Sequence, residues 1–589
     1  MTRRLLCLLF AVLVVGSVQL GCSGSPDKPD EALTDDEARA PAFLEDIPST
    51  SPYVFTSLRA FPMEILEPYL KTYGQIYDSM HKQLQQQYGG QSFMEQATSE
   101  EKFMYTLFGE LRKASTMEGY EELGFSTRPQ AAIYGIGWFP VMRITLGDAK
   151  ALEATLQRIE AETGVEVRMR SLGEQSYREY TLEPNLKLAA AITDSELIVG
   201  LSPPEAFDDF VAYMLGEKKP ARSMADVNVI EDIQAKYEFS AYGIGYADIK
   251  GIASVATGAA PGDEITRGML DAVGYQAPQM EEQCRTELMS IFETVPRAVF
   301  GYTTLTAELM EMSAVLETEH PFARELEETA APMPAYDSAM VEDSLVAVGL
   351  GIDVHKLSNF IGTQADRITR KPFQCPNFQQ INDTAQQAKM MRSMLPPFVT
   401  QIRGAMAMVT GVDMAQQAMQ PQSFDGLALV ETADPLTLFN QLQQFVPQLQ
   451  GASVQANGVP VALDGLSQLG WLKVPHVAMD DDTLAMSAGV GIQDDMAILL
   501  EDQKQAEAAE NSPLLLIAYD YGELMSRFYD SMAGGGAYGQ GQALGGSFEI
   551  MSKMFGTVVA EIDASDDGII LRYRARMFPD GGEGADASR

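Results

Sequence analysis

Apolar residues recur at every second position in some segments of this chain, as in strands, and about every 3.6 residues in others, as in helices. The same succession of predicted strands and helices occurs twice. In each succession a strand of alternating apolar residues ends at an aspartate, and apolar residues at helical spacing follow. Asp148 and Asp434 hold this position, 286 residues apart. An aspartate there can accept hydrogen bonds from the first N–H groups of a helix, so we predict that both are helix N-caps.

Other correspondences follow in the same order. A predicted hairpin that turns at residues 193–195 has a counterpart that turns at residues 480–482. A strand that enters a helix at Asp248 has a counterpart at Asp520. Both series open with a strand and a helix and close with a pair of strands. Five ordered correspondences predict an internal duplication; the alternative is the ordinary alternation of strands and helices in an α+β protein.

The predicted strands arrive mainly as hairpins, which favours antiparallel pairing. We therefore predict an α+β fold of two tandem homologous halves, residues 51–335 and 336–578. Each half is expected to hold an antiparallel or mixed sheet with helices packed on one face.

The first residues have the pattern of an export signal. Arg3 and Arg4 precede an apolar run over residues 5–16, which is too short to span a bilayer. The sequence Val-Gln-Leu-Gly-Cys then ends at Cys22. It resembles the lipobox of bacterial lipoproteins, with Gln19 in place of the usual leucine. The alternative is an ordinary secretory signal with an incidental cysteine.

The lipoprotein resemblance implies cleavage after residue 21 and lipidation of Cys22 with acyl chains such as palmitate. Ser23 implies sorting to the outer membrane, because aspartate at this position favours retention in the inner membrane. Residues 22–50 are rich in acidic residues, proline and serine, and are expected to form a disordered tether. Residues 579–589 are expected to form a disordered tail.

Charge narrows the set of partners. The chain has 42 Lys and Arg against 82 Asp and Glu, a formal net charge of −40. Nucleic-acid binding requires clustered cations, so this charge argues against it. It also argues against electrostatic docking of the whole chain on anionic lipid headgroups. A hydrophobic fraction of 46% with 21% charged residues indicates a globular chain.

Two cysteines remain for the folded part once Cys7 leaves with the signal and Cys22 carries lipid. Cys284 and Cys375 form an even pair in an exported protein, which predicts a disulfide between them. Two separately buried thiols are the alternative.

Motifs for catalysis, cofactors and metals are weak. The histidines lack the close spacing of metal ligands; they are His81, His320, His355 and His476. Asp480, Asp481 and Asp482 lie at a predicted hairpin turn and lack the spacing of a calcium loop. The glycine-rich segment 534–546 follows a predicted helix, whereas a phosphate loop follows a strand. We therefore predict no catalytic, cofactor-binding or metal-binding residue, and no enzyme.

Methionines gather in one region of the second half. They are Met390, Met391, Met394, Met406, Met408, Met414 and Met419. Methionine side chains adapt to irregular apolar surfaces, which suggests a groove for a lipid or an apolar peptide. Packing in the core is the alternative.

The order of elements resembles a large uncharacterised family of exported bacterial proteins, known only as a domain of unknown function. The resemblance supports the fold and implies no substrate. The expected function is that of a lipid-anchored cell-envelope protein of the outer membrane, periplasmic or surface-facing, which acts as a non-enzymatic scaffold or binding protein. A periplasmic carrier of a lipid or another apolar ligand is the alternative. An enzyme with a site assembled from distant residues is the second alternative.

Overall fold

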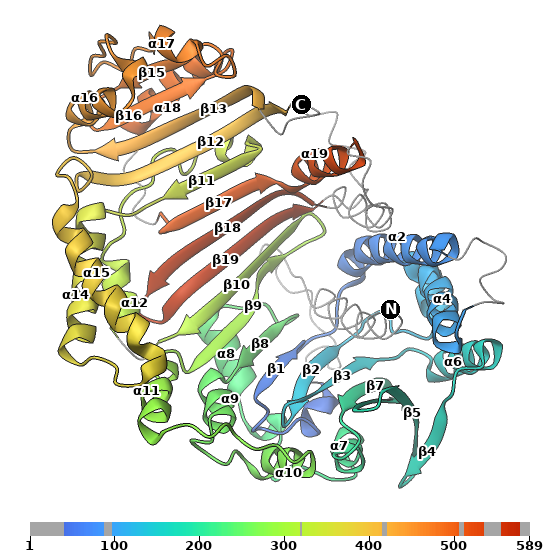
Figure 1. Cartoon of the computed structure of the whole chain (residues 1–589). Helices are drawn as coiled ribbons and strands as arrows, with labels where there is room; N and C mark the ends of the chain where they lie inside the picture. Colours follow the sequence, from blue (N-terminus) through green and yellow to red (C-terminus); the bar gives the residue numbers. More distant parts are fainter. Residues whose placement is uncertain are drawn as a thin grey trace.

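The computed structural model describes residues 41–87, 97–318, 321–414, 421–505, 512–534 and 555–577. Its secondary structure is α+β, with a single large sheet at its centre (Figure 1). None of the helices in these ranges is long and apolar enough to cross a membrane. Cys22, the tail 579–589, His320 and Met419 lie outside the described residues.

The nineteen strands of the described residues form one sheet, and every strand pairing is antiparallel. From one edge to the other, the order is β14 (Val461–Ala462), β15 (His476–Met479), β16 (Thr483–Ala488), β13 (Pro421–Thr432), β12 (Ile402–Met414), β11 (Val346–Leu350), β17 (Leu515–Asp520), β18 (Phe555–Ser565), β19 (Gly568–Met577), β10 (Leu309–Glu317), β9 (Arg297–Leu305), β8 (Ile244–Ala247), β1 (Tyr53–Thr56), β2 (Ala131–Ile136), β3 (Phe139–Thr145), β7 (Glu196–Ser202), β6 (Leu186–Ile192), β5 (Gln175–Glu183) and β4 (Arg168–Leu172).

Helices connect the strands in both parts of the chain. Those before residue 319 are η1 (Ala42–Glu45), α2 (Met63–Gln87), α4 (Ser99–Leu111), η3 (Arg112–Ser115), α5 (Met117–Glu122), α6 (Ala149–Thr163), α7 (Phe207–Met214), η4 (Met224–Asp226), α8 (Val229–Tyr237), α9 (Ile249–Ala256), α10 (Glu264–Ala272) and α11 (Glu282–Phe292). Those after residue 320 are α12 (Phe322–Glu327), α13 (Ala339–Asp343), α14 (Val354–Arg370), η5 (Pro376–Phe378), α15 (Gln379–Met394), α16 (Pro435–Phe445), η6 (Pro447–Leu449), α17 (Asp464–Ser467), α18 (Ile492–Gln505) and α19 (Tyr521–Gly534).

The predicted aspartate caps are confirmed. Asp148 accepts hydrogen bonds from the first turn of α6, and Asp434 accepts one from the first turn of α16. Asp248 caps α9 in the same way, and the Asp520 carboxylate accepts the N–H of Glu523 in α19. Each cap ends a strand and starts a helix within a few residues, so local sequence is sufficient to predict it.

The two parts of the chain share one sheet, whereas the sequence prediction gave a sheet to each half. Strands β10 and β19 join them, with Leu309 opposite Arg576 and Glu317 opposite Gly568. Each of these strands would otherwise be an edge with unpaired N–H and C=O groups. Their pairing satisfies those groups and leaves no exposed edge in the middle of the molecule.

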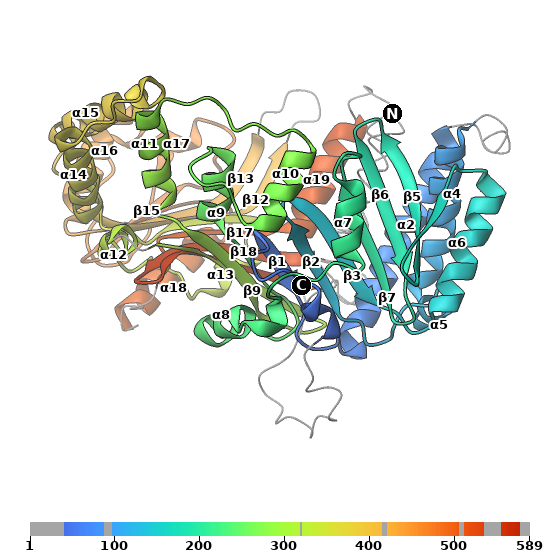
Figure 2. The ribbon, with the colours of Figure 1, turned by 90° about the horizontal axis from the view of Figure 1, so that it is seen from below.

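Helices cover both faces of the sheet, so the prediction that they pack on one face is wrong. We call the two sides face A, which carries Phe55 and Leu571, and face B, which carries Val54 and Ile570. Helices α7 and α8 pack on face B, while α4 and α6 lie on face A of the same strands (Figure 2). The reason is visible in β6 and β7, whose residues are apolar on both sides and are buried between two layers.

The expected tether is too long. Residues 41–50 belong to the fold: Phe43, Leu44 and Ile47 are buried in the largest core cluster, on face B. Phe43 and Leu44 lie in η1, and the Asp46 carboxylate forms an ion pair with the buried Arg143. Three apolar side chains and one buried ion pair outweigh the acidic composition that suggested disorder.

Candidate functional site

The three histidines that the structure describes lie on separate elements. His81 on α2 stacks on Tyr105 with 4.0 Å between ring centroids, which is a packing contact. His355 lies in the first turn of α14, and His476 on β15 contacts the carbonyl of Val474. Within the described ranges, no group of three or more His, Cys, Asp and Glu side chains is placed to hold a metal ion.

The three aspartates at 480–482 form the turn of the β15–β16 hairpin. The Asp480 carboxylate accepts the N–H groups of Asp482 and Thr483, at 3.1 and 2.7 Å. This is an Asx-type turn, in which the side chain satisfies the backbone of its own loop. The glycine-rich segment lies outside the described residues from residue 535 onward.

Cys284 and Cys375, whose pairing the sequence predicts, are joined in the structure, with 4.8 Å between their Cα atoms. The bond connects α11 to the loop between α14 and α15. Beside it, the Glu287 carboxylate of α11 accepts the N–H groups of Gln374 and Cys375 at 2.8 and 2.9 Å. These hydrogen bonds, that of Gln374 first, lower the pKa of the Glu287 carboxyl. The α14–α15 pair is therefore fixed to the first part of the chain at its loop end.

The methionine cluster divides into two groups. Met406 and Met408 on β12 are buried in the core of the second part, as the packing alternative predicts. Met390, Met391 and Met394 on α15 are 60–77% exposed. The clustering in sequence therefore marks a core strand and an exposed helix face rather than one groove.

An unusual surface lies on face A, in the middle of the sheet. Directly opposed residues of antiparallel strands point to the same side, so the register defines rows across the strands. One row runs Val348, Ile517, Ala560, Tyr573, Met312 and Tyr302. The next row runs Leu350, Leu515, Ile562, Leu571, Ala314 and Phe300. Neither row contains a charged side chain.

Six aliphatic side chains of this region are open to solvent although they lie within a sheet. Their exposed fractions range from 36% to 44%. We call them the open apolar face; they are Leu316, Val348, Leu350, Ile517, Ile562 and Leu571. In Figure 1 their strands β11, β17, β18, β19 and β10 form a broad strip between the α14–α15 pair and helix α19.

Helices close one end of this strip. From α2, Ile65 and Tyr69 pack with Tyr302 and Met577 in a separate core cluster. From α19, Tyr521 meets Phe555 edge to face, with ring centroids 5.8 Å apart. The sheet thus passes from a helix-covered region to an uncovered apolar region along the same strands.

The opposite side of the strip differs between its strands: β11 and β17 pack Ala347, Leu516 and Ala518 into the core of the second part, whereas β18, β19 and β10 carry charged residues. On face B, Glu311, Glu561, Arg572 and Arg574 line a pocket of about 420 Å³. The Tyr336 hydroxyl donates to Glu561 at 2.9 Å, so a residue of the segment between α12 and α13 helps to close this pocket. In β18, β19 and β10, apolar residues on face A therefore alternate with more polar residues on face B, and the apolar side is the open one. A contiguous apolar surface of this kind on a folded chain indicates a binding surface.

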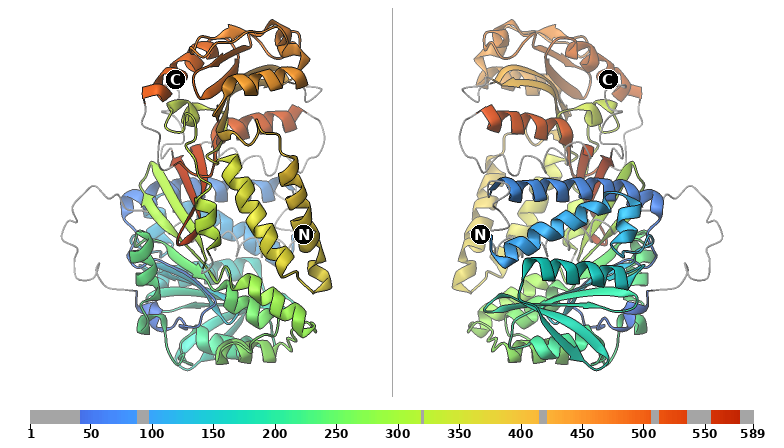
Figure 3. Two further views of the ribbon diagram at one scale, coloured as in Figure 1. Left: turned by 90° about the vertical axis from the view of Figure 1, so that its left-hand side faces the viewer. Right: turned by 90° about the vertical axis from the view of Figure 1, so that its right-hand side faces the viewer.

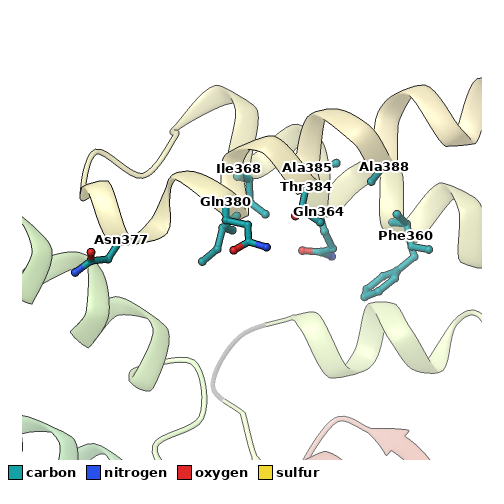
Figure 4. Close-up of a pocket in the computed structure, with 11 residues that line it drawn as sticks. Phe360, Gln364, Ile368, Asn377, Gln380, Thr384, Ala385 and Ala388 are labelled. Atoms are coloured by element: carbon teal, nitrogen blue, oxygen red, sulfur yellow. The ribbon is translucent and has the colours of Figure 1, made fainter.

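A second apolar concavity lies on the α14–α15 pair, next to the strip. It has a volume of about 510 Å³ between the two helices (Figure 4). Phe360, Ile361 and Ile368 line it from α14, and Ile381 and Ala385 line it from α15.

Sequence reasoning did not find the open apolar face. The alternation in β18 and β19 marks two chemically different sides, and that is the signal the sequence carries. It cannot tell which side is covered, because the covering helices come from distant parts of the chain.

Comparison with known proteins provides no identity for the chain: no family model, no curated protein and no solved structure matches it.

Proposed function

We propose that this chain is a lipid-anchored cell-envelope protein that binds the acyl chain of a lipid on its open apolar face. The observation that carries the proposal is the absence of charged side chains from the two face A rows, combined with the exposure of the six aliphatic side chains. Among the functions expected from the sequence, the proposal corresponds to a binding protein or carrier of an apolar ligand and not to a scaffold without a ligand. Catalysis is not part of the proposal.

The chemistry of the face favours an acyl chain. A ligand with polar groups along its length would lose hydrogen bonds to water without replacement on this surface, which is costly. The six strands from β11 to β9 span about 24 Å at the usual strand spacing. An acyl chain fills one leaflet of a bilayer, about half of its ~30 Å hydrocarbon core. Such a chain fits within the face.

We also propose that the two parts of the chain arose by duplication. The strand order β6-β7-β3-β2-β1-β8-β9-β10 in the first part has its counterpart in β15-β16-β13-β12-β11-β17-β18-β19 in the second. The caps Asp148 and Asp434 hold equivalent places in these series, which supports homology of the halves. In this reading the open apolar face forms at the junction of two related sheets.

The anchor is tested by Cys22→Ser. We expect the variant to leave the membrane fraction or to keep its signal segment uncleaved, because no acyl chains are attached. Fractionation of cells and the migration of the chain on a denaturing gel measure both effects. A variant that fractionates and migrates like the parent would show that Cys22 is not the anchor. Ligand binding by the folded part does not depend on this result.

Acyl binding is tested by placing a charge on the face. We expect Leu571→Glu and Ile517→Glu each to weaken binding of parinaric acid, a fluorescent long-chain fatty acid, at least tenfold, since the ligand would cover an unpaired carboxylate. Fluorescence titration of the chain carrying Cys22→Ser measures the affinity. Both side chains are partly exposed, so the sheet itself can accommodate the charge.

The matched control is Ile498→Glu, which makes the same kind of change at a 58% exposed isoleucine on α18, away from the face. It should bind the probe like the parent. Equal affinities for the parent and both face variants, at equal thermal stability, would refute the acyl-binding proposal. A dimer that dissociates in Leu571→Glu would instead make a second copy of the chain the occupant of the face.

A further inference from the structure

The α14–α15 pair stands beside the sheet rather than within the core (Figure 3). Gly362 and Ala365 are the buried residues of α14, and Ala385 is the buried residue of α15. The pair is held at its loop by the disulfide and along its length by Arg367, which binds the Glu325 carboxylate of α12. Most of its surface therefore faces solvent in a fixed orientation.

The charge of this segment is opposite to that of the chain. Residues 353–403 contain seven Lys and Arg and three Asp, a net charge of +4. The rest of the chain carries −44, since the total is −40. The whole-chain charge, which argues against docking on anionic lipids, conceals this cationic segment.

Among the residues that the structure describes, this segment has the most concentrated exposure of methionine. Met390, Met391 and Met394 occupy consecutive turns at the end of α15, with exposed fractions of 60%, 66% and 77%. Basic residues flank them: Arg392 lies between them on α15, and its guanidinium donates to the neutral amide of Asn359 on α14. Lys356, in the first turn of α14, is exposed. Adaptable apolar side chains are thus placed among cations, of which Lys389 is paired with Asp366 at 2.6 Å.

We propose that the α14–α15 pair docks on a membrane surface that carries anionic lipid headgroups. The methionines enter the boundary between headgroups and acyl chains, while Lys356, Arg392 and the exposed Arg370 contact lipid phosphates. Interfacial helices bind membranes through this combination of a buried apolar side and flanking cations. The long stems of Lys and Arg can follow the methionines while their charges stay at the phosphates.

A membrane is favoured over an acidic protein by charge complementarity together with the anchor. The chain held by lipid on Cys22 would already be concentrated at a bilayer, where weak cationic docking is sufficient to set its orientation. Because the pair lies beside the strands of the open apolar face, docking would also bring that face close to the membrane (Figure 1). The inference goes beyond acyl binding and stands without it.

The test is flotation of the full chain carrying Cys22→Ser, so that no acyl anchor contributes. The vesicles contain either phosphatidylglycerol mixed with phosphatidylcholine or phosphatidylcholine alone. We expect binding at least tenfold tighter to the anionic vesicles, weakened by salt because exposed charges are screened. Lys356→Gln and Arg370→Gln should each reduce the affinity about fivefold.

The methionines are tested by Met390→Ser, Met391→Ser and Met394→Ser together, with at least a tenfold loss expected. Met169→Ser, Val459→Ser and Val490→Ser together are the matched control, since these side chains are 57%, 56% and 82% exposed elsewhere. The control should bind like the parent. Absence of parent binding to anionic vesicles, or equal loss in both triple variants, would overturn the proposal; acyl binding to the open face would be unaffected.

Discussion

Replacing Arg143 with methionine should lower the free energy of unfolding by about 3–5 kcal/mol, because it leaves the largely buried Glu196 carboxylate without its cation, while Asp46 keeps its ion pair with Lys219. The Arg143 side chain is 3% exposed and lies 3.0 Å from a carboxylate oxygen of Asp46 and 2.8 Å from one of Glu196. It also donates to the carbonyl of Met214 and to the hydroxyl of Tyr134. Burial raises the pKa of the Glu196 carboxyl, although Arg143 acts in the opposite direction.

Urea unfolding followed by circular dichroism measures this effect. Arg143→Met combined with Glu196→Gln should recover part of the loss, since the side chain that loses its cation becomes neutral. Arg168→Met is the control, because Arg168 is exposed and makes only long ion pairs, of 3.9 and 4.0 Å. A loss below about 1 kcal/mol in Arg143→Met would mean that the network does not hold residues 41–50 in the fold.

Removing the disulfide should have the second large effect. The bond joins residues 91 positions apart, and closing a loop of this length can stabilise a fold by up to roughly 4–5 kcal/mol, with measured values often lower. In a chain carrying Cys22→Ser, Cys284→Ala with Cys375→Ala should unfold at a lower urea concentration than its oxidised parent. The parent should shift by a similar amount when a reductant is added.

The double cysteine variant serves as the control for the reductant. Its unfolding in urea should be the same with and without reductant, because it has no bond to reduce. Because the disulfide fixes the loop of the α14–α15 pair, amide exchange in residues 371–385 should also accelerate in the variant. Equal stability with and without reductant in the parent would show that the bond contributes nothing to the fold. If the double variant no longer binds anionic vesicles while α14 and α15 are still helical, membrane docking depends on the orientation of the helix pair as well as on its charge.

The proposed functions use neighbouring parts of one surface. The open apolar face belongs to the strands at the centre of the sheet, and the cationic helix pair lies at one side of that face (Figure 1). The two proposals are compatible, since an acyl chain bound on the open apolar face would come from the membrane on which the α14–α15 pair is proposed to dock.

The sequence by itself determined the local features. Asp148, Asp434, Asp248 and Asp520 cap helices because the carboxylate and the N–H groups it accepts lie within three residues of each other. The Asp480 turn follows for the same reason. The order of strands and helices could also be predicted, since the spacing of apolar residues within each segment differs between a strand and a helix.

Only the tertiary structure decided which surfaces are covered. The alternation of Leu571 and Arg572 marks two sides of β19 but does not tell which side meets solvent. That depends on β10, about 260 residues earlier, and on helices from both parts of the chain. The same holds for Phe43, which the sequence places in an acidic tether but which is buried against face B in the structure. Burial is a property of surfaces brought together from distant segments, and no local pattern contains it.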